Sequence, residues 1–285
     1  MVKPLISLAN SGAGTLGVLE AGAYKAIFEY FDIEEVAGTS AGSILSALIA
    51  LGYTPSEVID IVLDGDFSKL IDYSIPYMMI SLVDNKDSLF SLSSNKNVLS
   101  WLSNLTQNKV LKDTLIPFKA ITTDLYTGTY QVWDSKNPDH ENMLIKDAVY
   151  SSMAIPFVFP AYQGRYVDGG AVRNIPVQFL TGKNKLGVAI AERTGSGQTK
   201  NFFESVSSLL SILLSDDDKL IEDWAKVTQI PIIKLPSSGA RFLERNMPMS
   251  QKEELVQIGY ETAKQFINEN MSKICPTIKK TTKRH

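Results

Sequence analysis

The first 52 residues alternate twice between a short apolar run and a helix-like segment, with a glycine-containing turn between them. The apolar runs are 4–9 and 33–38, and the helix-like segments are 17–31 and 43–51. Short apolar runs that end in Asn, Ser or Gly are typical of buried strands, whereas apolar residues spaced by three and four predict a helix face. Two strand–turn–helix units in succession predict the parallel βαβ units of an α/β fold.

The rest of the chain predicts further elements around this start. We expect a less regular insertion over 64–116, followed by two strands over 117–134 that are joined by a turn at Gly128. Two later buried strands are expected at 186–192 and 230–235, with a helix between them over 202–224. The last helix is predicted from Ser250 as its N-cap with Glu253 three residues later, a capping box. Since no repeat and no clear linker is present, we expect one domain over 1–272 and a basic tail over 273–285.

Composition excludes several classes of function. Lys and Arg number 28 against 31 Asp and Glu, a net charge of -3 without the basic excess of a nucleic-acid-binding protein. The single Cys275 can form neither an internal disulfide nor a multi-cysteine metal site. Apolar stretches such as 75–83 are shorter than the ~18 residues that span a bilayer, and the N-terminus lacks a signal-peptide pattern. We therefore expect a cytoplasmic protein. We also expect that it needs no cofactor.

The turn between the second apolar run and its helix carries a serine between two glycines. Its sequence GTSAG, at 38–42, fits the pattern GxSxG, in which glycines allow a sharp strand-to-helix turn. Such a turn presents the serine hydroxyl at a helix N-terminus, where the dipole favours developing negative charge. Ser40 is therefore either a nucleophile or the N-cap of a tight turn.

A nucleophilic serine needs a base, and the chain has few candidates. The only histidines are His140, in a turn-like loop, and His285, at the end of a polar tail, so a Ser-His-Asp triad is disfavoured. Asp168, in RYVDGGAVRNIP, follows a short apolar strand and precedes two glycines. It is either a base that acts directly on the serine or the first residue of an Asx turn.

Acyl transfer also needs N–H donors for the oxyanion. The loop SGAGTLG offers the amides of Gly12, Ala13 and Gly14, and the Ala41 amide follows the serine. Phosphate binding is the alternative for a glycine-rich loop before a helix. However, this loop lacks the Walker Lys-Ser/Thr pair and the GxGxxG spacing.

These three motifs, in this order, resemble the patatin-like phospholipase family. SGAGTLGVLEAGAYKAI is similar to its opening block, VAGTSAGSILSALIALG to its elbow, and ITTDLYTGTYQVW to its central Thr-Asp-Leu segment. DAVYSSMAIPFVFPAYQGRYVDGGAVRNIPV is similar to its final catalytic block, so that the resemblance covers most of residues 4–180.

The resemblance implies a mostly parallel central sheet sandwiched between helices and hydrolysis of lipid acyl esters without a metal. It implies that Ser40 is the nucleophile and Asp168 the general base of a Ser-Asp dyad, with the oxyanion donors at Gly12, Ala13 and Gly14. Two positions depart from the family pattern Gly-Gly-Gly-x-Arg/Lys-Gly: Ala13 replaces a glycine and Leu16 replaces the basic residue.

Alternatives to a phospholipase A-like hydrolase remain open at this point. One is a neutral-lipid esterase or acyltransferase that uses the same site, and another is a catalytically weak lipid-binding or interaction protein that retains the fold. We expect a lipid or phospholipid substrate, no nucleic acid and transient contact with a membrane surface, to which the basic tail contributes. Candidate acyl-groove segments are 155–159, 77–83 and 209–214, and residues 70–95 are expected to form a cover over the site.

Overall fold

The computed structural model describes residues 2–73, 91, 93–191, 205, 208, 219–241, 243–244 and 246–276. Its strands are β1 (Leu5–Asn10), β2 (Asp32–Thr39), β3 (Asp72–Tyr73), β4 (Ser93–Ser94), β5 (Phe118–Asp124), β6 (Thr129–Asp134), β7 (Tyr166–Asp168), β8 (Lys185–Ile190) and β9 (Ile232–Leu235). Its α-helices are α1 (Gly17–Tyr30), α2 (Ala41–Ala50), α3 (Pro55–Asp64), α4 (Phe67–Leu70), α6 (Lys96–Thr106), α7 (Ile145–Met153) and α9 (Met249–Ile274). Residues 219–228 are also helical. Single 3₁₀ turns are η1 (Gly14–Leu16), η2 (Leu111–Asp113), η3 (Gly169–Ala171) and η4 (Val177–Phe179).

The central sheet has seven strands and is mostly parallel, as the sequence predicts. Its order is β6-β5-β2-β1-β8-β9, with β7 paired to β5 beyond this path. β1, β2, β5, β8 and β9 run parallel, and β6 and β7 are antiparallel to β5. The predicted β5–β6 hairpin turns at Gly128, whose φ of 68° lies in the left-handed region that glycine tolerates.

Both faces of the sheet are buried, which explains why its strands are continuous apolar runs. Successive residues of β1 point to opposite faces: Leu8 belongs to the larger core cluster, with α1, α2 and α9, while Ala9 belongs to a smaller cluster. The smaller cluster also holds Ala37 of β2, Ala189 of β8, Ile175, Val177, Leu180 and Ile221, so the segment after β7 and the helical residues 219–228 cover that face.

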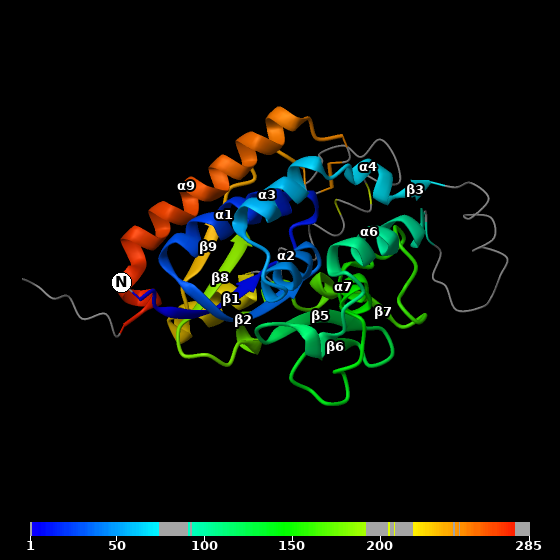
Figure 1. Ribbon diagram of the computed structural model, residues 1–285, viewed down its shortest axis with the longest axis horizontal. Helices are drawn as coiled ribbons and strands as arrows, with labels where there is room; N and C mark the ends of the chain where they lie inside the picture. The colour runs from blue at the N-terminus through cyan, green and yellow to red at the C-terminus, as the bar shows by residue number, and fades with distance from the viewer. Residues whose placement is uncertain are drawn as a thin grey trace, which may run out of the picture.

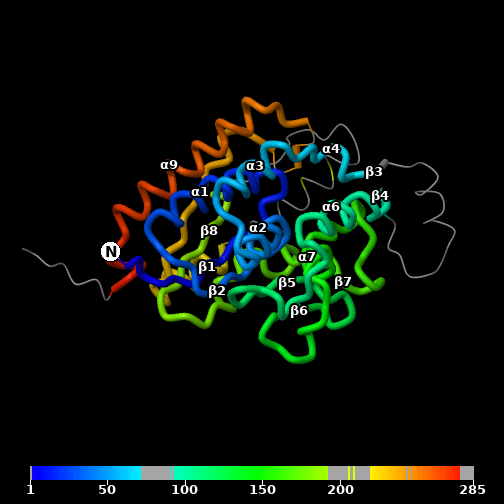
Figure 2. Tube along the Cα trace, viewed as in Figure 1, coloured from blue at the N-terminus to red at the C-terminus, as the bar shows by residue number. Residues whose placement is uncertain are grey.

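The helices divide between the two halves of the sheet. Figure 1 shows α9 running along α1 above β1, β8 and β9, and Figure 2 shows the chain of α6 and α7 gathered beside β5 and β7. The carboxyl ends of β2 and β5 therefore meet α2 and α7 at one edge of the sheet. This edge carries the serine turn.

Several predictions need correction or fall outside the described residues. The capping box is wrong: α9 begins at Met249 with Pro248 as N-cap, and no side chain caps it. Ser250 lies inside the first turn, because the Lys252 amide already donates to the Pro248 carbonyl. The predicted insertion holds α4, β3, β4 and α6. Segments 77–83 and 209–214, most of the expected cover and the end of the basic tail lie outside the described residues.

None of the helices in the described part of the chain is both long enough and apolar enough to cross a membrane.

Candidate active site

Ser40 occupies the sharp turn between β2 and α2. Its backbone angles are φ 52° and ψ −125°, a sparsely populated conformation for a residue with a Cβ, which costs on the order of 1–3 kcal/mol. The flanking glycines are required by close packing. A Cβ on Gly38 would overlap the Gly42 backbone, and one on Gly42 would overlap the carbonyl oxygens of Asn10 and Ser11. The pattern GxSxG therefore builds a strained turn that presents one hydroxyl.

The structure brings Ser40 and Asp168 together. The Ser40 hydroxyl donates a hydrogen bond of 2.6 Å to Oδ2 of Asp168, across 128 positions of sequence. Sheet register explains the meeting, because Thr39 lies opposite Ile121 on β5, and the next residue of β5, Thr122, lies opposite Asp168 on β7. Both side chains are nearly buried, with Ser40 at 3% and Asp168 at 6% exposure.

The Asp168 carboxylate is held in one orientation. Its Oδ1 accepts a 2.8 Å hydrogen bond from the Gly170 amide, which leaves Oδ2 directed at the serine. The backbone of Asp168 is also fixed, since its N–H donates to the Ala154 carbonyl and its own carbonyl accepts from the Thr123 hydroxyl. The Asx-turn contact and the contact to Ser40 therefore occur in the same side chain, one on each oxygen.

Ser152 on α7 is a site residue that the sequence analysis missed. Its hydroxyl accepts a 2.9 Å hydrogen bond from the Ser40 amide and donates one to the Ile121 carbonyl of β5. Ser152 is fully buried. It thus ties the strained turn to the strand on which β7 and Asp168 are registered.

The glycine-rich loop lies beside the serine. A Cβ on Gly12 would lie 3.2 Å from Cβ of Ser40. The Gly12 amide, however, donates to Oδ1 of Asn174 at 3.1 Å, a contact across 162 positions that the sequence analysis also missed. Asn174 is buried and follows the Asp-Gly-Gly motif by a few residues, so the glycine-rich loop and the Asp-Gly-Gly segment are joined through it. In the sequence, only the position of Asn174 within the segment RYVDGGAVRNIP indicated that it could belong to the site.

The two departures from the family pattern have structural explanations. Ala13 has φ −127°, so its Cβ causes no left-handed strain, and the position that does need positive φ is Gly14, at 53°. Leu16 is fully buried in the larger core cluster. In this chain the residue at that position is part of the core.

Other titratable groups near this edge are engaged elsewhere. Asp124, at the end of β5, accepts two hydrogen bonds from the Arg165 guanidinium, at 2.8 and 2.6 Å, which hold the pKa of its carboxyl well below the ordinary value. His140 lies in a loop, where its ring packs edge-on against Trp133 and its Nδ1 accepts from the Asp134 amide. His285 lies outside the described residues.

In the part of the chain that the structure describes, no group of His, Cys, Asp or Glu could hold a metal ion.

An apolar cavity of about 90 Å³ opens at Ser40. Its walls come from the glycine-rich loop, α2, α4, α6, the end of α7 and the segment after it, together with Leu243. Its apolar lining includes Ile44, Phe67, Leu70, Trp101, Ile155 and Phe159. Of the predicted groove segment 155–159, Ile155 and Phe159 line the cavity, whereas Phe157 is 40% exposed.

Comparison with known proteins identifies the family of the chain. The family described as Patatin-like phospholipase matches residues 8–181. The chain therefore belongs to the patatin-like phospholipase family, which places it among lipid hydrolases at the level of the family.

Individual relatives are distant. YqhO of Bacillus subtilis (strain 168) is 27% identical, over 91% of this chain and 97% of its own length. The patatin-like phospholipase domain-containing protein 7 of Rattus norvegicus is 24% identical, over 60% of this chain and 12% of that protein. Among solved structures, VipD from Legionella pneumophila has a TM-score of 0.60 and 15% identity, and the alignment covers 94% of this chain and 67% of VipD. This last likeness shows a shared fold.

Proposed function

We propose that the protein is a phospholipase A-like lipid acyl hydrolase that works through a Ser40–Asp168 dyad and an acyl-enzyme intermediate. The 2.6 Å hydrogen bond from the Ser40 hydroxyl to the Asp168 carboxylate is the observation that carries the proposal. A serine hydroxyl is a weak nucleophile unless a positioned base takes its proton, and this carboxylate is positioned to do so.

In the first step, the Ser40 oxygen attacks the ester carbonyl carbon while its proton passes to Oδ2 of Asp168. The resulting tetrahedral intermediate collapses with cleavage of the ester C–O bond, and the leaving alcohol or lysolipid takes the proton from Asp168. In the second step, the same carboxylate accepts a proton from water as the water oxygen attacks the acyl-enzyme carbonyl. The bond from the acyl carbon to the Ser40 oxygen then breaks, the proton passes from Asp168 to that oxygen, and the fatty acid is released.

The oxyanion is assigned to the loop of Gly12, Ala13 and Gly14. The Gly12 amide is directed at Asn174, so Gly12 anchors the loop, and the amides of Ala13 and Gly14 are the donors we assign to the oxyanion. The Ala41 amide, at the N-terminus of α2, adds the positive end of that helix.

The cavity beside Ser40 supports an acyl chain as the group that is transferred. Its lining is almost entirely apolar, and an alkyl chain placed there would be removed from water beside the reactive hydroxyl. A substrate with such chains resides in a membrane or lipid aggregate, so the proposal includes transient contact of the protein with a lipid surface. Transfer of the acyl group to an alcohol, or use of neutral-lipid esters, would employ the same residues.

The test combines labelling with product analysis. Wild type is expected to react with a serine-directed fluorophosphonate and to release fatty acid and lysolipid from mixed phospholipid vesicles. Ser40→Ala is expected to abolish labelling, and both Ser40→Ala and Asp168→Asn are expected to lower hydrolysis by at least about 1,000-fold, because nucleophile and base act as a unit. Ser100→Ala and Asp139→Asn, at exposed positions, are the matched controls and should retain full activity.

Two results would contradict the proposal, and each would indicate a different function. A wild-type chain that binds vesicles but neither labels nor hydrolyses them would indicate a lipid-binding protein that retains the fold. Release of more acylated alcohol than free fatty acid, when an alcohol acceptor competes with water, would indicate an acyltransferase.

A further inference from the structure

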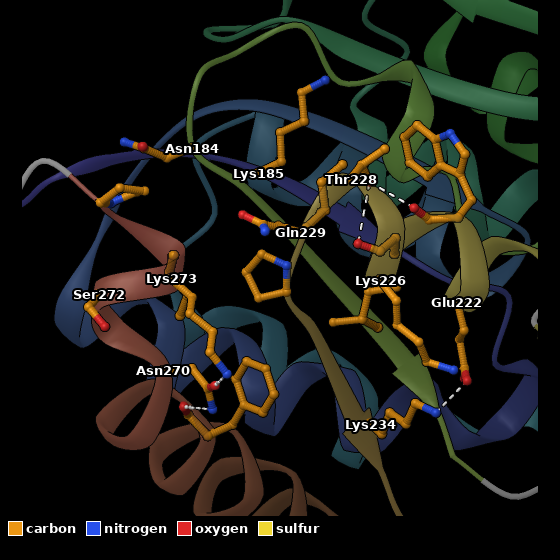
Figure 3. A pocket seen from close by; sticks show the side chains of 18 of the residues that line it. Asn184, Lys185, Glu222, Lys226, Thr228, Gln229, Lys234, Asn270, Ser272 and Lys273 are labelled. Atoms are coloured by element: carbon orange, nitrogen blue, oxygen red, sulfur yellow. Dashed lines mark hydrogen bonds and ion pairs between the residues drawn. The ribbon is translucent and has the colours of Figure 1, made fainter.

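A second concave site lies along the outer edge of β9, between the helical residues 219–228 and the last turns of α9 (Figure 3). Its volume is about 1060 Å³. Residues 183–185, which lead into β8, close one end, and Ile230, Pro231 and Phe266 contribute apolar surface. We call this site the β9 groove.

The lining of the β9 groove is strongly basic although the chain as a whole is acidic. Its charged lining residues are one glutamate, Glu222, and five lysines, namely Lys183, Lys185, Lys226, Lys234 and Lys273. Lys234 pairs with Glu222, and Lys226 pairs with Asp223. Lys183, Lys185 and Lys273 form no ion pair with any carboxylate of the described residues. The positive charges come from separate elements, as Figure 3 shows for Lys185, Lys226, Lys234 and Lys273, and are not gathered around one point.

The floor of the β9 groove is an open strand edge. β9 is the last strand in the sheet order, and its ladder to β8 uses the carbonyls of Pro231 and Leu235. Because backbone groups alternate in direction along a strand, the N–H and C=O groups of Ile232 and Lys234 point to the other edge. No described strand pairs with that edge. An extended chain can add to such an edge by main-chain hydrogen bonds.

The β9 groove lies at the end of the sheet opposite to Ser40. Lys183 and Asn184 precede β8 and Ile230 precedes β9, whereas Ser40 follows the last residue of β2, which runs parallel to them. A ligand in the groove therefore leaves the entrance of the acyl cavity open. A bilayer resting against the groove would hold Ser40 on the far side of the molecule, and a flat surface does not fill a concave site.

We infer that the β9 groove binds an acidic, extended segment of a partner protein, which pairs with the β9 edge and places carboxylates against Lys185, Lys234 and Lys273. Apolar side chains between the carboxylates pack on Ile230, Pro231 and Phe266. The inference rests on the edge, the charge and the shape of the groove, and it is independent of whether Ser40 is catalytic.

The charge requirement is tested with the full chain and a fluorescent peptide of alternating Glu and Val, with a Lys-Val peptide of equal length as the control probe. The Glu-Val peptide is expected to bind and the Lys-Val peptide not to bind. The double variant Lys185→Glu/Lys273→Glu is expected to weaken binding roughly tenfold or more. Lys96→Glu/Lys136→Glu, which makes the same charge change at exposed positions elsewhere, should bind like wild type.

The edge requirement is tested with Ile232→Pro, which removes an outward N–H but none of the N–H groups directed at β8. It is expected to weaken peptide binding while thermal unfolding shows that the fold is retained. If Ile232→Pro unfolds the protein, an Ile232 backbone ester, which removes the same N–H alone, takes its place. Equal binding of the Glu-Val and Lys-Val peptides would overturn the inference. It would also be overturned if neither peptide bound, while wild type bound phosphatidylserine vesicles and the double lysine variant did not.

Discussion

Ser152 supports the turn that presents Ser40, the nucleophile we propose, through a hydrogen bond to the Ser40 amide. Removal of its hydroxyl in Ser152→Ala leaves the buried Ser40 amide without its acceptor and the Ile121 carbonyl without its donor. An unsatisfied buried group costs about 1–3 kcal/mol, so the strained turn should relax. We expect kcat to fall roughly tenfold or more with little change in KM, measured with a soluble ester.

The neighbouring Ser151 provides the matched control for this prediction. Its hydroxyl donates to the Ala148 carbonyl and accepts from the Trp133 indole, without contact to Ser40. Ser151→Ala should therefore lower stability but retain kcat. Equal loss of kcat in both variants would mean that Ser152 has only a structural role.

The sequence indicated the proposed dyad better than the residues that support it. Ser40 and Asp168 stand in short glycine-containing motifs that residue type and spacing marked as candidates, the family resemblance implied their roles, and the structure places the two side chains in contact. Ser152 and Asn174 act through single hydrogen bonds to Ser40 and Gly12, across 112 and 162 positions respectively. Serine and asparagine are common, and a contact made only by folding leaves no periodic or local pattern. Their roles therefore required coordinates.

At the scale of elements, the packing of α9 on α1 depends on two glycines. A Cβ on Gly259 would overlap the Leu19 carbonyl, and one on Gly22 would overlap the Val256 carbonyl, so the two helix backbones approach closely. Gly259→Ala should force the helices apart and lower the free energy of unfolding by about 1–3 kcal/mol in urea titrations. Gly17→Ala is the control, because its Cβ would make only an ordinary 3.5 Å contact to Ala41 and should not destabilise the fold.

Elements with strong periodicity were predicted well, and those set by tertiary contacts were not. The strands β1, β2, β5, β6 and β8 and the helix α1 lie within two residues of their predicted bounds. The start of α9 was misplaced because Ser250 and Glu253 imitate a capping box, whereas Pro248 and the buried Met247 fix where the helix begins. The pairing of β7 with β5, which positions Asp168, could not be read from a strand of three residues.

At the scale of the whole molecule, a buried ion pair joins three segments that are distant in the sequence. It lies near the start of β5, at the end of the strands away from Ser40. The Glu35 carboxylate of β2 contacts the Lys119 ammonium of β5 and accepts hydrogen bonds from the Thr181 and Gly182 amides. Burial alone would raise the pKa of Glu35, but the Lys119 ammonium and the two amides together lower it below the ordinary 4.5. A carboxylate whose pKa is lower in the folded state stabilises the fold above its unfolded-state pKa.

The stability of the chain should therefore fall in acid partly through Glu35. At neutral pH, Glu35→Gln should lower the free energy of unfolding by about 3 kcal/mol, because Lys119 is left buried without its partner. As the pH falls below about 4.5, Glu35 takes up a proton first in the unfolded state and only at lower pH in the folded state, so the difference between wild type and variant should shrink. Urea titrations across a pH series measure this difference. Glu141→Gln, which breaks the exposed 3.9 Å pair with Lys112, should change stability by less than about 1 kcal/mol at any pH. If the difference in free energy of unfolding between wild type and Glu35→Gln stayed constant as the pH falls, the charge of Glu35 would not contribute to holding the three segments together. The effect of the substitution would then come from the shape of the side chain.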